Sequence, residues 1–594
     1  MNGTGMSKNV IILDAAGKRK AWNAYLARSG KEGVVVVTSG QVCAFPPRLF
    51  PIGISFGEEK IDFGRVTDEA KRDQIKEALA EAGPSGCVYI ATDKDVEGDA
   101  IALDVLNIIA ESASHLLMRS YRAHPKSLTP ADISDSIETA LPVMQNYQRI
   151  VDAAVEGRAR SVTDRWIGAA LSRAADTPIG RVRSAIPGMV LLHQTRPSSL
   201  RGPVEVGETV FTARSATGGL PFRVRVALMS DDPPERRARL TNIARRFSNR
   251  LIPGAVMPVV SLSAAVADRF MNVRPHNTGD AVAHAARHYG VRPHLAMQGL
   301  LRAYYRGDVS YPRTDSRTLT PQSAAKVARL GASCEVYGLS ASDAVEMDRS
   351  ERVHEALHPV CEASLTHVKR LREILRKDWV SAFAALPAGA EPDPEMMADL
   401  MTAIVTRRAF ESAKAAKSER GFWRPGNDLM STALSHEDFD LLEHLEWDRE
   451  LGPVLPWTRH MTTGARVWPR ESVLMDMMMT EELGRPSSLP SLLKTVVAAG
   501  DIDVSDDPDP FSGPDPFRLP TLTAQGRENL RKMPRTIWDP ATGRSIARAL
   551  ANSDGESNET PKDHIDARIR KRVALWLGKM DAAVRDPLLA AIPE

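Results

Sequence analysis

The chain has 594 residues with an apolar fraction of 43% and a charged fraction of 26%. These values predict a soluble globular protein of several domains, because one hydrophobic core does not serve a chain of this length. The 77 basic residues barely exceed the 75 acidic ones, so any nucleic-acid surface must be a local basic patch. Residues 1–9 lack the apolar core of a signal peptide, and no run of about 18 apolar residues could span a membrane.

The four cysteines are scattered, and none forms a Cys-x-x-Cys pair. This spacing argues against a zinc ribbon and against a disulfide scaffold, and it favours a reducing cytoplasm. We also find no internal repeat and no phosphate-binding P-loop.

The first expected element is a buried strand at 10–13, which ends at Asp14. Lys18 follows in the turn into a helix expected from Arg19 to about Ala27. Side chains at the carboxyl end of such a strand often carry function in open α/β sheets. The local alternative is that Asp14 caps the helix and that Lys18 is solvated.

Three carboxylates follow another expected strand, 87–91, at alternate positions: Asp93, Asp95 and Glu97. Carboxylates that converge repel one another unless a cation lies between them, and oxygen ligands with free water positions suit Mg²⁺. A helix is expected from about Asp99. The alternatives are a solvated acidic turn or an EF-hand-like calcium loop reaching Asp104, although no helix is expected before that loop.

A long helix is expected over 147–171. It carries Arg160, whose simplest role is a salt bridge with Asp164 one turn later. A basic turn with Arg181 and Arg183 follows.

Alternating segments at 209–213 and 222–226 predict antiparallel strands within a β-rich region, about 203–266. The arginine-rich segment 236–250 is expected to be a helix with a solvated face. The tryptophan- and proline-rich stretch 441–467 cannot be assigned from its pattern.

Helices expected over 278–289 and 295–305 lead to a short segment with Tyr311 and Arg313. In an extended chain these two side chains point to the same side, so both can reach one phosphate. A tyrosine and an arginine can attack and stabilise a phosphodiester, whereas most tyrosines at strand ends simply pack. We therefore expect the fold to bring this segment to the acidic cluster.

Later segments are less specific. His354 and His358 have zinc-ligand spacing, but Pro359 ends any helix and no third ligand is evident, so we expect no zinc. A loop is expected over 505–516 and a linker over 553–562. A basic helix over 564–580 either contacts a phosphate backbone or packs as a capping helix.

Taken in order, these segments resemble the motifs of the type IA DNA topoisomerases across roughly residues 10–530. The resemblance rests on seven segments in register: Asp14 with Lys18, 91–98, 152–168, 180–182, 311–316, 354–356 and 484–487. Four positions depart from the family pattern, namely Asp14 for glutamate, Val96 for arginine, Arg183 for glutamine and Tyr305 for glutamate. The family's C-terminal zinc fingers are not expected, given the cysteines.

The resemblance implies an α/β plus α+β multidomain fold with a toroidal core. It comprises an N-terminal Toprim α/β domain, a helical DNA-binding domain in two parts, a β-rich arch in two parts, a tyrosine-bearing domain, and a linker with a basic C-terminal helix. The implied ranges are, in that order, 1–149, 150–205 with 441–552, 206–270 with 405–440, 271–404, and 553–594.

The resemblance also implies a mechanism. Tyr311 would attack single-stranded DNA to give a 5′-phosphotyrosine, and strand passage and religation would relax negatively supercoiled DNA or decatenate it. Asp14 would protonate the leaving 3′-oxygen or position groups. The remaining implied roles are phosphate contact by Arg313, Lys18 and His354, Mg²⁺ binding by Asp93, Asp95 and Glu97, and DNA contact by Arg160, Arg181, Arg183, Asp315, Ser316 and Arg485.

No ATP is expected to be used, since the bond energy would be kept in the phosphotyrosine. A monomer in the bacterial cytoplasm, on the nucleoid or a plasmid, is expected. Two alternatives stay open. One is a Toprim metal nuclease that cuts without a covalent intermediate, and the other is a weakened homologue that serves as a single-strand DNA-binding or scaffold subunit.

Overall fold

The computed structural model describes most of the chain except several loops and the surroundings of the second sheet. The described residues are 8–46, 54–56, 61–63, 66–82, 85–195, 205–213, 222–229, 235, 259–261, 274–334, 354–360, 370–371, 373–374, 377, 379, 391–415, 421–423, 444–446, 458–462, 470–485, 488–505, 520–551, 563–578 and 585–586. The predictions for 236–250 and 553–562, and most of the expected loop 505–516, lie outside them.

The amino-terminal part is built on a five-stranded sheet. Its order is β2 (Gly33–Val37), β1 (Asn9–Leu13), β7 (Val88–Ile90), β8 (Ser120–Arg122) and β9 (Leu141–Pro142). The first four strands are parallel and β9 runs antiparallel to β8. Its central strands are continuous apolar runs because both faces of a parallel sheet are covered. The strands expected at 10–13 and 87–91 are confirmed.

Helices cover both faces of this sheet. Val10 and Ile12 pack with α2 (Glu69–Ala82) and α3 (Val96–Ser112) on one face. Ile11 and Leu13 pack with α1 (Arg19–Ser29) and α4 (Pro130–Glu138) on the other. The alternation of a strand's side chains divides β1 between the two cores.

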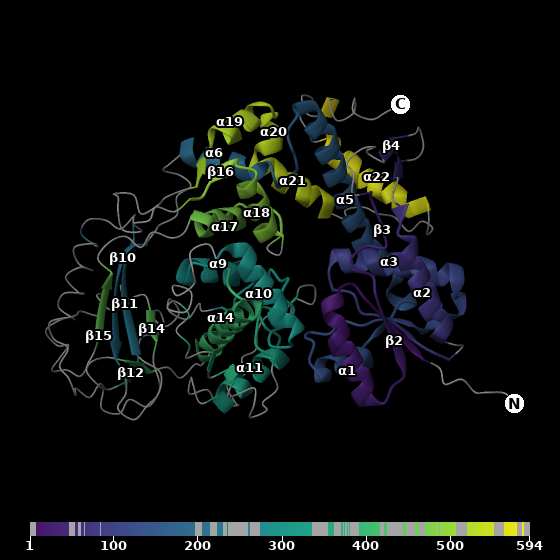
Figure 1. Cartoon of the computed structure of the whole chain (residues 1–594), viewed down its shortest axis with the longest axis horizontal. Helices are drawn as coiled ribbons and strands as arrows, with labels where there is room; N and C mark the ends of the chain where they lie inside the picture. Colours follow the sequence, from purple (N-terminus) through teal and green to yellow (C-terminus); the bar gives the residue numbers. More distant parts are fainter. Residues whose placement is uncertain are drawn as a thin grey trace.

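A second sheet is antiparallel, with the order β14 (His444–Glu446), β11 (Phe222–Met229), β10 (Glu205–Ala213) and β15 (Thr458–Thr462). The strands expected at 209–213 and 222–226 are therefore confirmed. The unassigned stretch 441–467 supplies β14 and β15, so the sheet draws on residues beyond 440. Figure 1 shows this sheet at one end of the molecule and the parallel sheet at the other.

Helices fill the space between the two sheets (Figure 1). One group holds the tyrosine segment and contains α9 (Thr278–Tyr289), α10 (Pro293–Tyr305), α11 (Pro321–Cys334) and α14 (Pro394–Ala415). A second group contains α6 (Ala185–Thr195), α17 (Arg470–Thr480), α18 (Leu489–Ala498), α19 (Ala524–Arg531), α20 (Arg535–Trp538) and α21 (Pro540–Ala551). The groups meet where α9 packs against α17.

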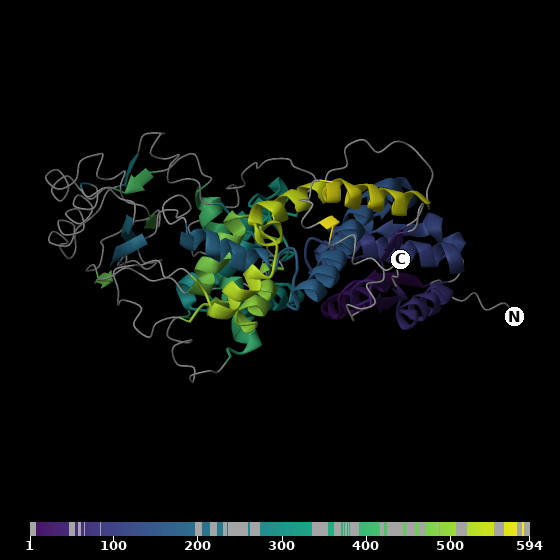
Figure 2. The same cartoon turned by 90° about the horizontal axis from the view of Figure 1, so that it is seen from above.

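The basic tail helix α22 (Asp563–Gly578) lies along α5 (Tyr147–Ala175), as Figure 2 shows from above. Arg568 forms an ion pair of 2.6 Å with Asp152 of α5. Arg572 is buried and donates a 3.0 Å hydrogen bond to the carbonyl of Leu550. These contacts agree with the packing alternative for this helix. No helix of the described residues has the length and apolar character needed to cross a membrane.

The start of α3 differs from the prediction. The helix begins at Val96, three residues before Asp99, because Asp95 is its N-cap and accepts a 2.8 Å hydrogen bond from the Gly98 amide. An aspartate in this position satisfies an amide that the helix itself cannot. The turn is tight, and a Cβ atom added to Gly98 would lie 2.0 Å from the carbonyl oxygen of Asp93.

We therefore expect Gly98→Ala to lower the free energy of unfolding by about 1–3 kcal/mol, the usual cost of overpacking. Gly168→Ala in α5 is the matched control, because its added Cβ would meet nothing closer than 3.6 Å and alanine favours a helix by about 0.5–1 kcal/mol. Urea denaturation of both variants checks this. Equal midpoints would contradict the tight turn.

Candidate active site

A buried cluster of charges lies where two neighbouring strands end. Asp14 follows β1 and Asp93 follows β7, and Lys18, which is 3% exposed, lies between them. The Lys18 ammonium group donates to Asp14 Oδ1 at 2.6 Å and also to Asp93 Oδ1. Asp14 thus binds Lys18 and caps no helix, so the local alternative for these two residues is wrong.

Tyr311 reaches this cluster from a distant part of the chain. Its hydroxyl donates to Asp93 Oδ2 at 2.7 Å and lies 3.5 Å from Asp95 Oδ2. Arg313 Nη1 is 3.9 Å from Asp93 Oδ2. The tyrosine and arginine segment therefore meets the acidic cluster, as the sequence predicted.

The cluster lines a cavity of about 160 Å³. Both parts of the chain contribute walls. The lining residues are Asp14, Ala15, Lys18, Gly40, Asp93, Asp95, Glu97, Gly98, Ile101, Leu301, Tyr304, Tyr305, Tyr311 and Arg313. Seven of the eight candidates for catalysis and metal binding therefore share one cavity, and the eighth, His354, stacks on Tyr311 with ring centroids 4.5 Å apart.

Backbone hydrogen bonds hold the tyrosine segment in place. The Tyr311 amide donates to the Lys126 carbonyl at 3.2 Å, which ties the segment to the domain of the acidic cluster. On its own side, the Thr278 hydroxyl donates to the Pro312 carbonyl at 2.6 Å and accepts from the Thr314 amide at 2.8 Å. The N-terminal turn of α9 is therefore the platform of this segment.

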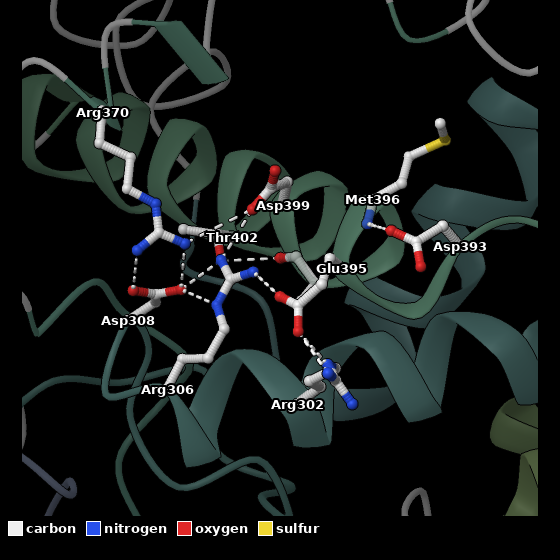
Figure 3. Close-up of polar contacts among 10 residues, drawn as sticks. Arg302, Arg306, Asp308, Arg370, Asp393, Glu395, Met396, Asp399 and Thr402 are labelled. Carbon is white, nitrogen blue, oxygen red and sulfur yellow. Dashed lines mark hydrogen bonds and ion pairs between the residues drawn. The ribbon is translucent and has the colours of Figure 1, made fainter.

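An ionic network anchors the start of the same segment (Figure 3). Asp308 is 2% exposed and receives Arg306 and Arg370, whose closest contacts are 2.5 and 3.2 Å. Arg306 also reaches Glu395 and Asp399 of α14, each at 2.8 Å. A buried carboxylate needs such paired and hydrogen-bonded partners. The network fixes the chain three residues before Tyr311.

Arg122 performs a similar task for the loop that carries Asp93. Its fully buried guanidinium donates to the carbonyl of Asp93 at 3.2 Å and to Thr92 Oγ1 at 2.6 Å. Asp99 neutralises it at 2.7 Å. This residue was not predicted from the sequence, because the short strand that places it, β8, was not expected.

Burial raises the pKa of Asp14 to about 6. The charge of neighbouring Asp93 adds to this rise, and Lys18 only partly opposes it. Burial also acts against the charged form of Asp93, but Lys18 and hydrogen bonds from Asp14 and Tyr311 outweigh it and lower the pKa of Asp93 to about 2. The pKa values of the two carboxyl groups are thus driven apart. Asp14 holds a proton at mildly acid pH, whereas Asp93 stays ionised.

Burial raises the pKa of Tyr311 well above its usual range, and the charges of Asp93 and Asp95 raise it further while Arg313 opposes them. The phenol is therefore a neutral hydrogen-bond donor in this arrangement. Burial likewise lowers the pKa of His354, so its ring is neutral at pH 7.

The carboxylates expected to hold a metal have different environments. Asp93 is occupied by Lys18 and Tyr311, and Asp95 Oδ1 caps α3. Glu97 has no hydrogen-bond partner among the described residues, and burial, followed by Asp95, raises its pKa. Within that same set, no three His, Cys, Asp or Glu side chains converge in a ready-made metal site. Asp95 Oδ2 and Glu97 remain directed at the cavity.

The calcium-loop alternative is wrong. Its last ligand, Asp104, lies inside α3, is buried, and bonds to Arg158 at 2.7 Å and to the Cys43 amide at 3.1 Å.

Among the candidate DNA-binding residues, Arg160, Arg181 and Arg485 form a basic surface, and Arg485 lies close enough to the cavity to oppose the raised pKa of Glu97. Arg160 pairs with Glu156 at 2.7 Å, and Arg485 approaches the same carboxylate at 3.8 Å. Arg181 binds Asp164 at 2.8 Å, so the expected pair between Arg160 and Asp164 is wrong.

Three further candidates have the following environments. Burial raises the pKa of Asp315 while Arg485 opposes it, which places Asp315 near that surface. Arg183 has a buried Nε without a hydrogen-bond partner among the described residues. Ser316 Oγ lies 3.0 Å from Thr318 Oγ1. Pro486 and Ser487, which follow Arg485, lie outside the described residues.

Comparison with curated proteins finds DNA topoisomerases. The chain is 29% identical over 187 residues to DNA topoisomerase 1 of Campylobacter jejuni, a match of 30% of this chain and 24% of that protein. It is 25% identical over 202 residues to DNA topoisomerase 1 of Mycoplasma pneumoniae, covering 30% and 27% of the two chains. With DNA topoisomerase 1 of Thermoplasma acidophilum the identity is 29% over 275 residues, covering 44% and 33%.

These matches confirm the likeness to type I DNA topoisomerases that the motifs predicted. The matched part of the chain spans about a quarter to a third of the length of each relative. No model of a known protein family matches the chain.

The pKa of Asp14 has a measurable consequence. Because the group takes up its proton near pH 6 in the folded state and near 3.8 otherwise, it stabilises the fold fully below pH 3.8 and loses that contribution as pH rises through 6. The loss is at most about 3 kcal/mol. The lowered pKa of Asp93 changes the stability only below pH 3.8, where the stability falls as pH falls.

Denaturation of the wild type and Asp14→Asn across pH 4–7 tests this. The stability advantage of the wild type should shrink as pH rises. A constant difference would show that Asp14 is ionised throughout.

Proposed function

We propose that this chain is a type IA DNA topoisomerase that cuts one DNA strand through a 5′-phosphotyrosine at Tyr311. The observation that carries the proposal is the 2.7 Å hydrogen bond from the Tyr311 hydroxyl to Asp93, which joins the tyrosine to Lys18 and Asp14 in one cavity. The likeness to curated topoisomerases supports it. The substrate would be single-stranded or negatively supercoiled DNA, bound by a monomer without ATP.

In the proposed cleavage step, the phenolic oxygen of Tyr311 forms a bond to phosphorus and the bond from phosphorus to the 3′-oxygen breaks. A buried phenol is a poor nucleophile, so it needs a positive field as its proton passes along the hydrogen bond to the Asp93 carboxylate. Arg313 and Lys18 supply that field, and they stabilise charge on the phosphoryl oxygens. His354, whose buried Nε2 has no hydrogen-bond partner among the residues that the structure describes, is placed to contact the same phosphate.

Asp14 is the group that can supply a proton to the leaving 3′-oxygen. Its pKa of about 6 keeps a proton available close to neutral pH, and a general acid works best when its pKa is near the working pH. Religation is the reverse: the 3′-hydroxyl returns its proton to Asp14 and attacks the phosphotyrosine. The bond energy is conserved, which is why no nucleotide is required.

Asp95 and Glu97 are the residues that would hold Mg²⁺. Two carboxylates fit this ion, which usually keeps several waters and takes one or two carboxylates together with substrate phosphates. Burial raises the pKa of Glu97, and the charge of Asp95 raises it further, so a cation between these two carboxylates would relieve their repulsion. When bound, the ion would neutralise phosphate charge and position the DNA.

We also propose that the chain divides, as expected, into a Toprim domain, helical domains, a β-rich arch and a tyrosine domain. Strand passage would require the contact between Tyr311 and Asp93 to open while the DNA end stays covalently held. Arg160, Arg181, Arg183, Asp315, Ser316 and Arg485 would guide the strand. Binding led by the backbone would be sensitive to salt and tolerant of sequence.

Tyr311→Phe is expected to abolish both relaxation of negatively supercoiled plasmid and the covalent protein–DNA species trapped by denaturant. The phenyl ring keeps the packing but lacks the attacking oxygen. The assay contains Mg²⁺ and no ATP. Tyr25→Phe, a buried tyrosine of α1 outside the cavity, is the matched control and should keep both activities.

Cleavage that survives Tyr311→Phe would move the chemistry to the acidic cluster, as in a metal nuclease. DNA binding with neither activity in the wild type would favour the scaffold alternative.

Glu97→Gln is expected to raise the Mg²⁺ concentration for half-maximal relaxation about tenfold or more, because it removes one charged ligand. Glu69→Gln, on the exposed part of α2, is the control. Calorimetric titration of Mg²⁺ into the protein with a bound oligonucleotide gives a readout independent of turnover. Unchanged Mg²⁺ dependence in both assays would remove Glu97 from the metal site.

A further inference from the structure

A group of basic side chains lies close to His354 and has no role in the proposed chemistry. His354 joins the two regions: its ring stacks on Tyr311 at 4.5 Å and hydrogen-bonds to the backbone of Lys94. Lys94 stands between Asp93 and Asp95, which both face the Tyr311 hydroxyl. Lys94 itself has no ion pair within the part of the chain that the structure describes.

The segment 122–126 forms the next wall of this region. Arg122 grips the carbonyl of Asp93 at 3.2 Å, and the carbonyl of Lys126 accepts the amide of Tyr311 at 3.2 Å. His124 lies between these two anchors. Both of its ring nitrogens are shielded from solvent and lack a hydrogen-bond partner among the described residues. A buried imidazole without partners is costly unless a ligand or water satisfies it.

Arg149, in the first turn of α5, completes the group. Burial lowers the pKa of Lys94, and the charge of Arg149 is the next cause, so the two cations lie near each other. His124 feels Arg122, Lys94 and Arg149 after the larger effect of its own burial, all of which lower its pKa. The nearby acids are already engaged, because Asp99 pairs with Arg122 at 2.7 Å and Glu355 lies 3.6 Å from Lys126 and 2.9 Å from Thr320.

Like charges that gather without a counter-charge repel one another, and an anion between them removes the cost. We propose that Lys94, His124 and Arg149 form a binding site for a phosphate group. The group is the phosphodiester of the bound strand that lies next to the one attacked by Tyr311. Two cations and a hydrogen-bonding imidazole suit a phosphate oxygen set. This inference rests on the proposed function, since it assigns the site to the same DNA strand.

The site would hold the strand on one side of the reacting phosphate while Arg313 and Arg485 hold it on the other. A strand fixed at two points stays in register when the covalent bond is made or broken. The contact carries no base information, because phosphate contacts position a strand without reading it.

The test measures binding of a single-stranded oligonucleotide in the Tyr311→Phe background, where no cleavage interferes. Lys94→Gln with Arg149→Gln should lower affinity about fivefold or more and reduce the slope of log K against log salt by about 0.7 for each lost phosphate contact. Arg527→Gln with Arg531→Gln, at exposed positions of α19, is the charge-matched control and should change neither. Thermal unfolding confirms that the variants fold.

The decisive arm replaces one phosphate at a time by an uncharged methylphosphonate. At one position the replacement should weaken binding to the parent protein. It should leave binding to the double variant unchanged, because that variant already lacks the contact. His124→Phe should also reduce that coupling. Coupling at no position overturns the assignment to the strand.

Inorganic phosphate distinguishes the two sources of the group. If it raises the unfolding temperature of the parent but not of the double variant, while no methylphosphonate couples, the site binds a free anion and the strand assignment is wrong. If neither effect occurs, there is no phosphate site. Covalent adduct formation is measured separately with Tyr311 intact, so a chain that binds as expected but forms no adduct refutes only the proposed function.

Discussion

The rest of the site depends on the burial of Lys18 between Asp14 and Asp93. An ammonium group taken out of water requires anionic partners, and the two parallel strands deliver one carboxylate each at their carboxyl ends. Because Lys18 carries a single positive charge, it does not lower the pKa of both carboxyl groups to the same extent. Asp93 keeps its negative charge and receives Tyr311, whereas Asp14, with a pKa of about 6, takes up a proton at mildly acid pH. One buried lysine therefore sets both the docking of the tyrosine and the division of labour between the acids.

The same constraint couples the domains. The hydroxyl of Tyr311 satisfies an oxygen of Asp93 that would otherwise be buried without a donor, and Tyr311 in turn is shielded by Tyr304 and His354, with ring centroids at 5.7 and 4.5 Å. Aromatic side chains pack around this hydrogen bond, since the ring of Tyr305 also lies against Gly17. When the contact opens, water can donate to Asp93 in place of the phenol.

Much of this arrangement could be predicted from local patterns. Apolar runs that end in Asp14 and Asp93 identify adjacent strands, and alternate spacing places Tyr311 and Arg313 on one side. The start of α3 was missed because the capping role of Asp95 competes with the ligand role that its spacing suggests. Arg122 and the network around Asp308 were beyond sequence reasoning, because their partners, Asp99 and Asp399 among them, are chosen by tertiary packing. The pairing of Arg160 with Glu156 likewise depended on where Arg181 takes Asp164.

The packing of α22 against α5 has a consequence for synthesis. Arg568 meets Asp152 across 416 residues of sequence, so α5 leaves the ribosome long before the helix that covers it. At 5–20 residues per second the delay is about 20–80 s. During that time one face of the helix that carries Arg160 is open to water or to a chaperone. The order of translation thus leaves this face of α5 uncovered until α22 has been made.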